Sequence, residues 1–261
     1  MKRSRPWFKP LLWLAITAFL PGASAATLTL QAVADSSLFE GNPDFNLGST
    51  TLVAGMNQEY ERARALFLFD LGGIPSGAVV TGVSVSLYVS RRPDPDQHGG
   101  PVDSDFSLHR LFVSWGEGSG GNATGSVAMA GDATWNQRHA GAISWANPGG
   151  QPGVDYANDP SATTAISGVG GYLWGSTAGL VNDVRAWLAD PSSNFGFMLI
   201  SQSENALGSG RRFGSSEQAG GLVTMPQLMV TYDPVPEPSV AGLWMIAWTG
   251  LLLTRKRWPT R

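Results

Sequence analysis

The sequence contains no cysteine, and this absence excludes two kinds of chemistry. The chain can form neither a disulfide framework nor a metal site built from thiolates. Its stability must therefore come from a hydrophobic core. Residues 26–234 are long enough for one such core, because single β-sandwiches and barrels often run to about 200 residues or more. We expect one domain.

Lysine is absent from residues 26–234, and positive charge there is scarce. This segment holds nine arginines against nineteen acidic residues, a formal balance of −10. A surface with this charge repels phosphate backbones. Nucleic acid is therefore not expected as a partner.

Sequence motifs of the common catalytic sites are also missing. There is no GxSxG, HExxH, P-loop or dinucleotide-binding pattern, and His98, His109 and His139 are not spaced as metal ligands. We therefore expect a protein that is not an enzyme. The alternative is a small polysaccharide lyase or hydrolase, in which Glu117, Asp132 and His139 of the irregular middle would act as acid and base.

The N-terminus has the pattern of a signal peptide. Basic residues lie within positions 2–9, an apolar run covers residues 11–20, and the small-x-small sequence Ala23-Ser24-Ala25 follows. The alternative is a permanent membrane anchor, but about ten apolar residues are too few to cross a bilayer. We predict a signal peptide over residues 1–25.

The C-terminus pairs an apolar helix with a basic end. The apolar run over residues 240–253 would be about 21 Å long as a helix, and the basic cluster 255–257 would hold its end in the cytoplasm. Together with Pro236, Glu237 and Pro238, residues 234–261 resemble a PEP-CTERM sorting signal. That resemblance implies removal of the tail by an exosortase in a Gram-negative bacterium that makes extracellular polysaccharide. The alternative is an uncleaved anchor.

Between these ends the sequence predicts many strands and little helix. Residues 79–90 alternate apolar and polar side chains, which is typical of a strand with one buried face. Residues 64–70 have two apolar faces, which favours a central strand. Further strands are expected at residues 28–33, 51–54, 106–113, 171–174, 195–201, 211–214 and 227–232. One helix is predicted over residues 180–188, capped by Thr177 and ended by Asp190-Pro191.

Several sequence blocks, taken in order, form a pattern that spans nearly all of residues 26–234. These blocks are Asp35 and residues 42–48, 64–71, 74–78, 133–136, 143–145, 180–188, 194–197 and 226–232. Together they resemble a DNRLRE domain, the disaggregatase-related family. The family is similar to jelly-roll carbohydrate-binding modules, so the resemblance implies that fold and glycan binding. We expect an all-β, jelly-roll-like β-sandwich with one short helix over residues 26–233, flanked by the signal peptide and the C-terminal hydrophobic helix.

Exposed aromatic rings are the first candidates for sugar binding, because sugar CH faces are apolar and stack on them. Tyr88 is expected on the solvent face of its strand, where the alternative is an ordinary surface residue. Trp115 and Trp145 could line a binding site, as could Trp135 and Trp174. The alternative for these tryptophans is packing of the loops onto the core.

Arginines are the second set of candidates, because a guanidinium can grip a uronate carboxylate with two hydrogen bonds. Arg91 and Arg92 follow Tyr88 closely and are predicted to bind ligand. Arg211 and Arg212 could do the same. The alternative for both pairs is structural ion pairing with the acidic residues at positions 204, 217 and 233.

A structural Ca²⁺ ion is the one cofactor that we consider. Asp35, Glu40, Asp44 and Asn46 supply hard oxygen ligands within one expected loop. Their spacing is not that of an EF-hand.

Taken together, these patterns predict an exported, non-catalytic protein of the cell surface or exopolysaccharide matrix that binds carbohydrate. Its expected partners are extracellular polysaccharide and, during processing, signal peptidase and exosortase. The C-terminal helix would hold the precursor in the inner membrane transiently. The alternative is a structural matrix or biofilm protein with no defined sugar site.

Overall fold

The computed structural model describes residues 24–96, 100–122, 125–217 and 225–234. Residues 1–23 of the predicted signal peptide and residues 235–261 of the predicted sorting segment, with Pro236, Glu237 and Pro238, lie outside these ranges. None of the helices in the described ranges is long and apolar enough to cross a membrane.

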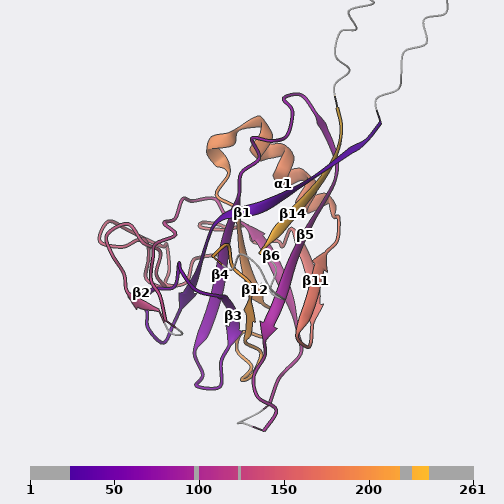
Figure 1. The fold of residues 1–261 in the computed structure, drawn as a ribbon. Coiled ribbons are helices and arrows are strands. Elements are labelled where there is room, and N and C mark those ends of the chain that lie inside the picture. The colour runs from indigo at the N-terminus through magenta and orange to yellow at the C-terminus, as the bar shows by residue number, and fades with distance from the viewer. Residues whose placement is uncertain (1–23, 97–99, 123–124, 218–224, 235–261) are drawn as a thin grey trace, which may run out of the picture.

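The described chain folds into two antiparallel sheets packed face to face (Figure 1). Sheet A contains the first part of β1 (Ala26–Phe39), β14 (Gln227–Asp233), β5 (Val79–Arg91), β11 (Gly170–Trp174), β13 (Arg211–Phe213) and β3 (Leu52–Met56). Sheet B contains the second part of β1, then β4 (Arg62–Phe69), β12 (Phe197–Ser201), β6 (Ser104–Arg110) and β10 (Ala162–Ile166). This arrangement confirms the predicted all-β, jelly-roll-like sandwich.

Two strands belong to both sheets. Residues 26–31 of β1 pair with β14, whereas residues 32–39 pair with β4, and the register shifts between Ala32 and Ala34. Strand β3 likewise pairs with β13 in sheet A and with β4 in sheet B. These shared strands join the two sheets along one side.

The main hydrophobic core lies between the sheets. The alternation predicted for β5 is confirmed, because Val83, Val85, Leu87 and Val89 are buried and the intervening residues reach solvent. Sheet B contributes aromatic rings, including the pair Phe67 and Phe197, and β11 contributes the fully buried Trp174. Each such ring removes a large apolar area from water, which is the main favourable term in folding.

A second core covers the outer face of sheet B. Leu38, Leu66 and Met198 project outward from the sheet and pack against Trp135 and Trp145. These tryptophans come from the long connection between β6 and β10. The strands in the described residues of this connection are short: β7 (Ser126–Val127), β8 (Gln137–His139) and β9 (Ile143–Ser144). β7 pairs with β2 (Phe45–Asn46), and β8 pairs with β9. The predicted central strand, β4, is therefore buried on both faces, as expected.

The helix α1 (Ala178–Ala189) covers one end of the sandwich (Figure 1). Thr177 caps it, since its hydroxyl accepts a hydrogen bond from the backbone N–H of Leu180 at 3.1 Å. Val184 and Trp187 turn into the main core. The helix ends before the short 3₁₀-helix η1 (Pro191–Ser193), in agreement with the prediction.

Candidate functional site

The outer face of sheet A remains open to solvent, unlike that of sheet B. On β5 this face carries Ser84, Ser86, Tyr88 and Ser90, all half-buried. Beyond β14, which pairs with β5, strand β1 adds exposed threonines at positions 27 and 29. The result is a surface rich in hydroxyl groups on which the ring of Tyr88 is accessible, as the alternation in the sequence predicted.

A groove lies at the end of this face, where β5 meets β13. Its volume is about 390 Å³. Phe39, Leu47 and Val53 are apolar residues of its lining, and the arginines at positions 91, 92, 211 and 212 also line it. We call this site the arginine groove. It combines an apolar surface with charged hydrogen-bond donors, which is the combination that a charged sugar ring requires.

Arg91 and Arg212 lie directly opposite each other on two adjacent strands that border the groove. Arg212 of β13 is paired with Arg91 of β5, next to a register shift. Burial and, second, the charge of Arg91 lower the pKa of the Arg212 guanidinium. Like charges placed opposite each other on adjacent strands destabilise a sheet. An anion bound between them would remove this repulsion.

Carboxylate partners for these arginines are absent from the described part of the chain. The ion pairs found there involve Arg62, Arg64, Arg110 and Arg211, and each of these is matched with an acidic residue. Arg91, Arg92 and Arg212 take part in none of them. Their donors are therefore available to a ligand.

The opposite rim of the groove is the turn between β3 and β4. Asn57 organises this turn, because its side-chain oxygen accepts from the backbone N–H groups of Glu59 and Glu61 at 2.8 and 3.0 Å. Its side-chain amide donates to the Glu61 carboxylate at 2.8 Å. Both carboxylates line the groove and can accept hydrogen bonds from hydroxyl groups. Sequence reasoning missed this rim, although the polar run between two apolar strands marked a turn.

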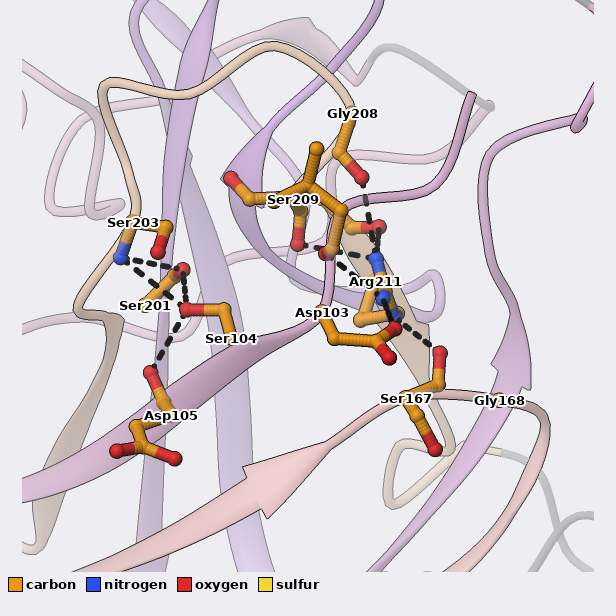
Figure 2. A network of polar contacts seen from close by, with 12 residues as sticks. Asp103, Ser104, Asp105, Ser167, Gly168, Ser201, Ser203, Gly208, Ser209 and Arg211 are labelled. Atoms are coloured by element: carbon orange, nitrogen blue, oxygen red, sulfur yellow. Dashed lines mark hydrogen bonds and ion pairs between the residues drawn. The ribbon is translucent and has the colours of Figure 1, made fainter. Parts of the chain in front are cut away.

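Arg211 has a different role from its neighbour Arg212. Figure 2 shows its guanidinium enclosed by backbone carbonyls, and its side chain is 0% exposed. It donates to the carbonyl oxygens of Ser167 and Val102 at 3.2 and 3.0 Å, and to those of residues 208, 209 and 210 at 3.0 to 3.2 Å. Arg211 is therefore a structural residue, but its partners are backbone carbonyls and Asp103 and not the acidic residues at positions 204, 217 and 233 that the sequence offered.

A second hollow lies on the other side of the Arg211 network. Its volume is about 420 Å³, and a hydrogen-bonded pair of buried serines, Ser104 and Ser201, lies beneath it (Figure 2). Asp103 and Asp105 line this hollow, and no arginine does. Its charge disfavours an acidic ligand, so the arginine groove is the better candidate site.

The tryptophans predicted to bind ligand do not reach the groove. Trp145 is only 4% exposed, and its indole N–H donates to the carbonyl of Thr134 at 2.9 Å. Trp115 is half-buried beside the second core, and its indole N–H donates to the carbonyl of Phe195 at 2.9 Å. The buried ring of Trp145 offers no face to a sugar, and Trp115 packs beside the second core and away from the residues that line the groove, so the geometry supports the packing alternative for both.

The four predicted metal ligands do not form one site, because each is engaged by other residues of the chain. Glu40 pairs with Arg62 at 2.6 Å, and Asp44 accepts from the amide of Asn136 at 2.8 Å. Asn46 is fully buried, and both the nitrogen and the oxygen of its side-chain amide make hydrogen bonds. Asp35 is also fully buried, but it lies in β1, away from Asn46 in the chain. Within the residues that the structure describes, no three acidic or histidine side chains converge on one point.

The residues considered for hydrolysis have structural partners. Glu117 accepts from the backbone N–H of Asp35 at 2.8 Å, and Asp132 accepts from that of Met129 at 2.9 Å. The ring nitrogens of His139 lie 3.1 Å from the hydroxyl of Ser114 and 3.2 Å from the carbonyl of Gly131. Each of the three side chains thus has its own structural partner, and none of these contacts joins one of the three to another.

Comparison with known proteins gives no assignment. Neither the protein-family models nor the curated proteins contain a match to this chain. The DNRLRE and PEP-CTERM resemblances therefore stay predictions.

Proposed function

We propose that this chain is an exported, non-catalytic β-sandwich protein that binds acidic polysaccharide of the cell surface or extracellular matrix at the arginine groove. One observation carries the proposal. Arg91 and Arg212 lie side by side, without a carboxylate partner among the described residues, on a domain whose overall charge is strongly negative. The signal peptide and the PEP-CTERM-like segment support export, and the DNRLRE resemblance supports glycan binding.

Uronates fit the groove better than neutral sugars. A uronate carboxylate can accept two parallel hydrogen bonds from a guanidinium, and its charge would offset the repulsion between the paired arginines. Of the apolar residues that line the groove, Phe39 and Leu47 are buried, so the half-buried Val53 offers the main apolar contact for the CH face of the ring. The hydroxyls and Tyr88 along β5 extend the surface beyond the groove, which suits a polymer rather than a monosaccharide.

The Arg212→Ala variant tests the ligand. In calorimetric titration of the full chain in detergent with polygalacturonic acid, we expect affinity to fall at least about tenfold, because a hydrogen bond to a charged group is worth about 1.5–3 kcal/mol. Added salt should also weaken binding by the native protein. The carboxyl-reduced polymer, which is matched in length but neutral, should bind less tightly than the acid form.

Arg185→Ala is the matched control for this experiment. Arg185 is exposed and donates to the carbonyl of Val80, at the other end of β5 from the groove. Removing its charge should leave affinity unchanged. Equal losses in the two variants would show that only net charge matters and would contradict the groove. A folded protein that binds no polysaccharide would favour the structural matrix alternative.

Tyr88 provides a separate prediction about the open face. We expect Tyr88→Ala to weaken binding of the same polymer by about three- to tenfold, the size of a stacking contact. Tyr88→Phe keeps the ring and should retain most of the affinity. Unchanged affinity in the alanine variant would confine the site to the groove.

A further inference from the structure

An unusual backbone conformation lies in the turn between β3 and β4. Tyr60 has a φ of 64°, in the left-handed region that favours glycine and asparagine. For a bulky residue such as tyrosine this conformation is strained, because its Cβ comes too close to the backbone carbonyl. Strained residues persist only where the surrounding structure fixes them, and they gather at binding and catalytic sites. Tyr60 is therefore a candidate for a functional role.

Hydrogen bonds within the turn hold Tyr60 in this conformation. The backbone N–H of Asn57 donates to the carbonyl of Glu61 at 3.0 Å, and the side chain of Asn57 accepts from the two N–H groups that flank Tyr60. The side-chain amide of Gln58 donates to the carbonyl of Asp94 at 3.3 Å, which ties the turn to the segment that follows β5. None of these bonds uses the side chain of Tyr60.

The ring of Tyr60 has no part in the hydrophobic core. The residue is 72% exposed, and it belongs to none of the three hydrophobic clusters of the described chain. Glycine or asparagine would form the same turn with less strain. Neither core packing nor turn formation therefore accounts for a tyrosine here. An exposed aromatic ring is, however, the surface on which the CH face of a sugar stacks.

Tyr60 lies at the rim of the arginine groove. The residues on either side of it in the chain, Glu59 and Glu61, line the groove together with Arg91 and Arg212. Tyr60 itself is outside the lining, so a ligand that contacts both the arginines and the ring must extend past the rim. A polymer that leaves the groove over this rim would meet the ring with its next sugar unit.

We propose that Tyr60 is a stacking platform for acidic polysaccharide and receives the sugar unit next to the one that the arginines hold. This inference rests on the proposed function and deepens it, because it makes the ligand a chain of at least two sugar units. The carboxylates of Glu59 and Glu61, which flank Tyr60 in the turn, can accept hydrogen bonds from the hydroxyls of that second unit. The strained turn thus presents a ring to the ligand at the expense of stability.

The test compares two variants that both remove the ring. In calorimetric titration of the full chain in detergent with polygalacturonic acid, Tyr60→Ala and Tyr60→Gly should each lose about three- to tenfold in affinity, the size of a stacking contact. Tyr60→Phe keeps the ring and should retain most of the affinity. Thermal unfolding, followed by tryptophan fluorescence, should give Tyr60→Gly a Tm about 3 °C above that of Tyr60→Ala and no lower than that of the native protein, because glycine adopts this conformation without strain.

Phe112→Ala is the matched control, because Phe112 is 44% exposed and does not line the groove. This variant should bind the polymer like the native protein. The inference is overturned if Tyr60→Ala keeps the native affinity, if Phe112→Ala loses as much affinity as Tyr60→Ala, or if the Tm of Tyr60→Gly falls more than about 3 °C below the native value, which would give the ring a structural role. Native affinity in Tyr60→Ala leaves the proposed function intact, since Arg212→Ala tests that function separately. Absence of binding by the native protein would overturn both.

Discussion

Replacing Asn46 with alanine is expected to lower the free energy of unfolding by about 4 kcal/mol, since several buried backbone groups would lose their only side-chain partner at once. The amide of Asn46 donates to the carbonyls of Glu117 and Ala133 at 2.8 and 2.9 Å and to the hydroxyl of Ser36. Its oxygen accepts from the N–H groups of residues 48 and 120 at 2.9 and 2.7 Å. One fully buried side chain thus fixes three separate segments.

Urea unfolding would measure this loss, and Asn136→Ala is the matched control. Asn136 makes one exposed side-chain hydrogen bond, to Asp44, so its replacement should cost less than about 1 kcal/mol. A loss below about 1 kcal/mol for Asn46→Ala as well would mean that the loop over residues 117–120 holds its position without the amide. Asn46→Asp should also be destabilising, because a carboxylate cannot donate to the two carbonyls.

Arg211→Ala should be nearly as damaging, with an expected loss of about 3 kcal/mol. The loss comes from the carbonyls, because five backbone oxygens would lose the guanidinium as a donor, and of these the Gly208 oxygen would keep its bond from the backbone N–H of Val102. The ion pair with Asp103 contributes little, since that carboxylate is 68% exposed and 3.4 Å away. Arg211→Lys should recover only part of the stability, because an ammonium has three donors and lacks the planar fork.

Arg212→Ala is the natural comparison for Arg211→Ala. The two residues are adjacent, but Arg212 is half-buried on the outer face and takes part in no ion pair of the described chain. Its replacement should change stability by less than about 1 kcal/mol while reducing polysaccharide binding. Denaturation curves and titrations of both variants would separate the two roles. Similar losses of stability in both variants would contradict a structural role for Arg211 and a binding role for Arg212.

Local patterns in the sequence were enough to predict most of the sandwich. The alternation over residues 79–90 gave β5 and its buried face, and the capping residue Thr177 gave the start of α1. The strand β10 was missed, because Ala162-Thr163-Thr164-Ala165-Ile166 has little apolar contrast. β10 forms because it pairs with β6, although its own sequence favours a strand only weakly.

The candidate site was predicted only in part, because the pairing register of strands distant in the sequence brings its residues together. Tyr88, Arg91 and Arg92 were found from the sequence, but the pairing of Arg91 with Arg212 depends on strands about 120 positions apart. The expected loop over residues 35–46 is instead strand as far as Phe39. Polar residues at the start of this segment are fully buried, and their partners at positions 117 and 216 could not be identified from local pattern.

The pairing of β1 with β14 fixes how the groove would be presented by a tethered molecule. Ala26 lies opposite Tyr232, so both ends of the sandwich leave from the same pole (Figure 1). Asp233 is also opposite Val79, the first residue of β5, whereas Arg91 is the last. A strand of this length spans about 40 Å. Held by either end, the domain would act as a spacer that carries its arginines away from the point of attachment.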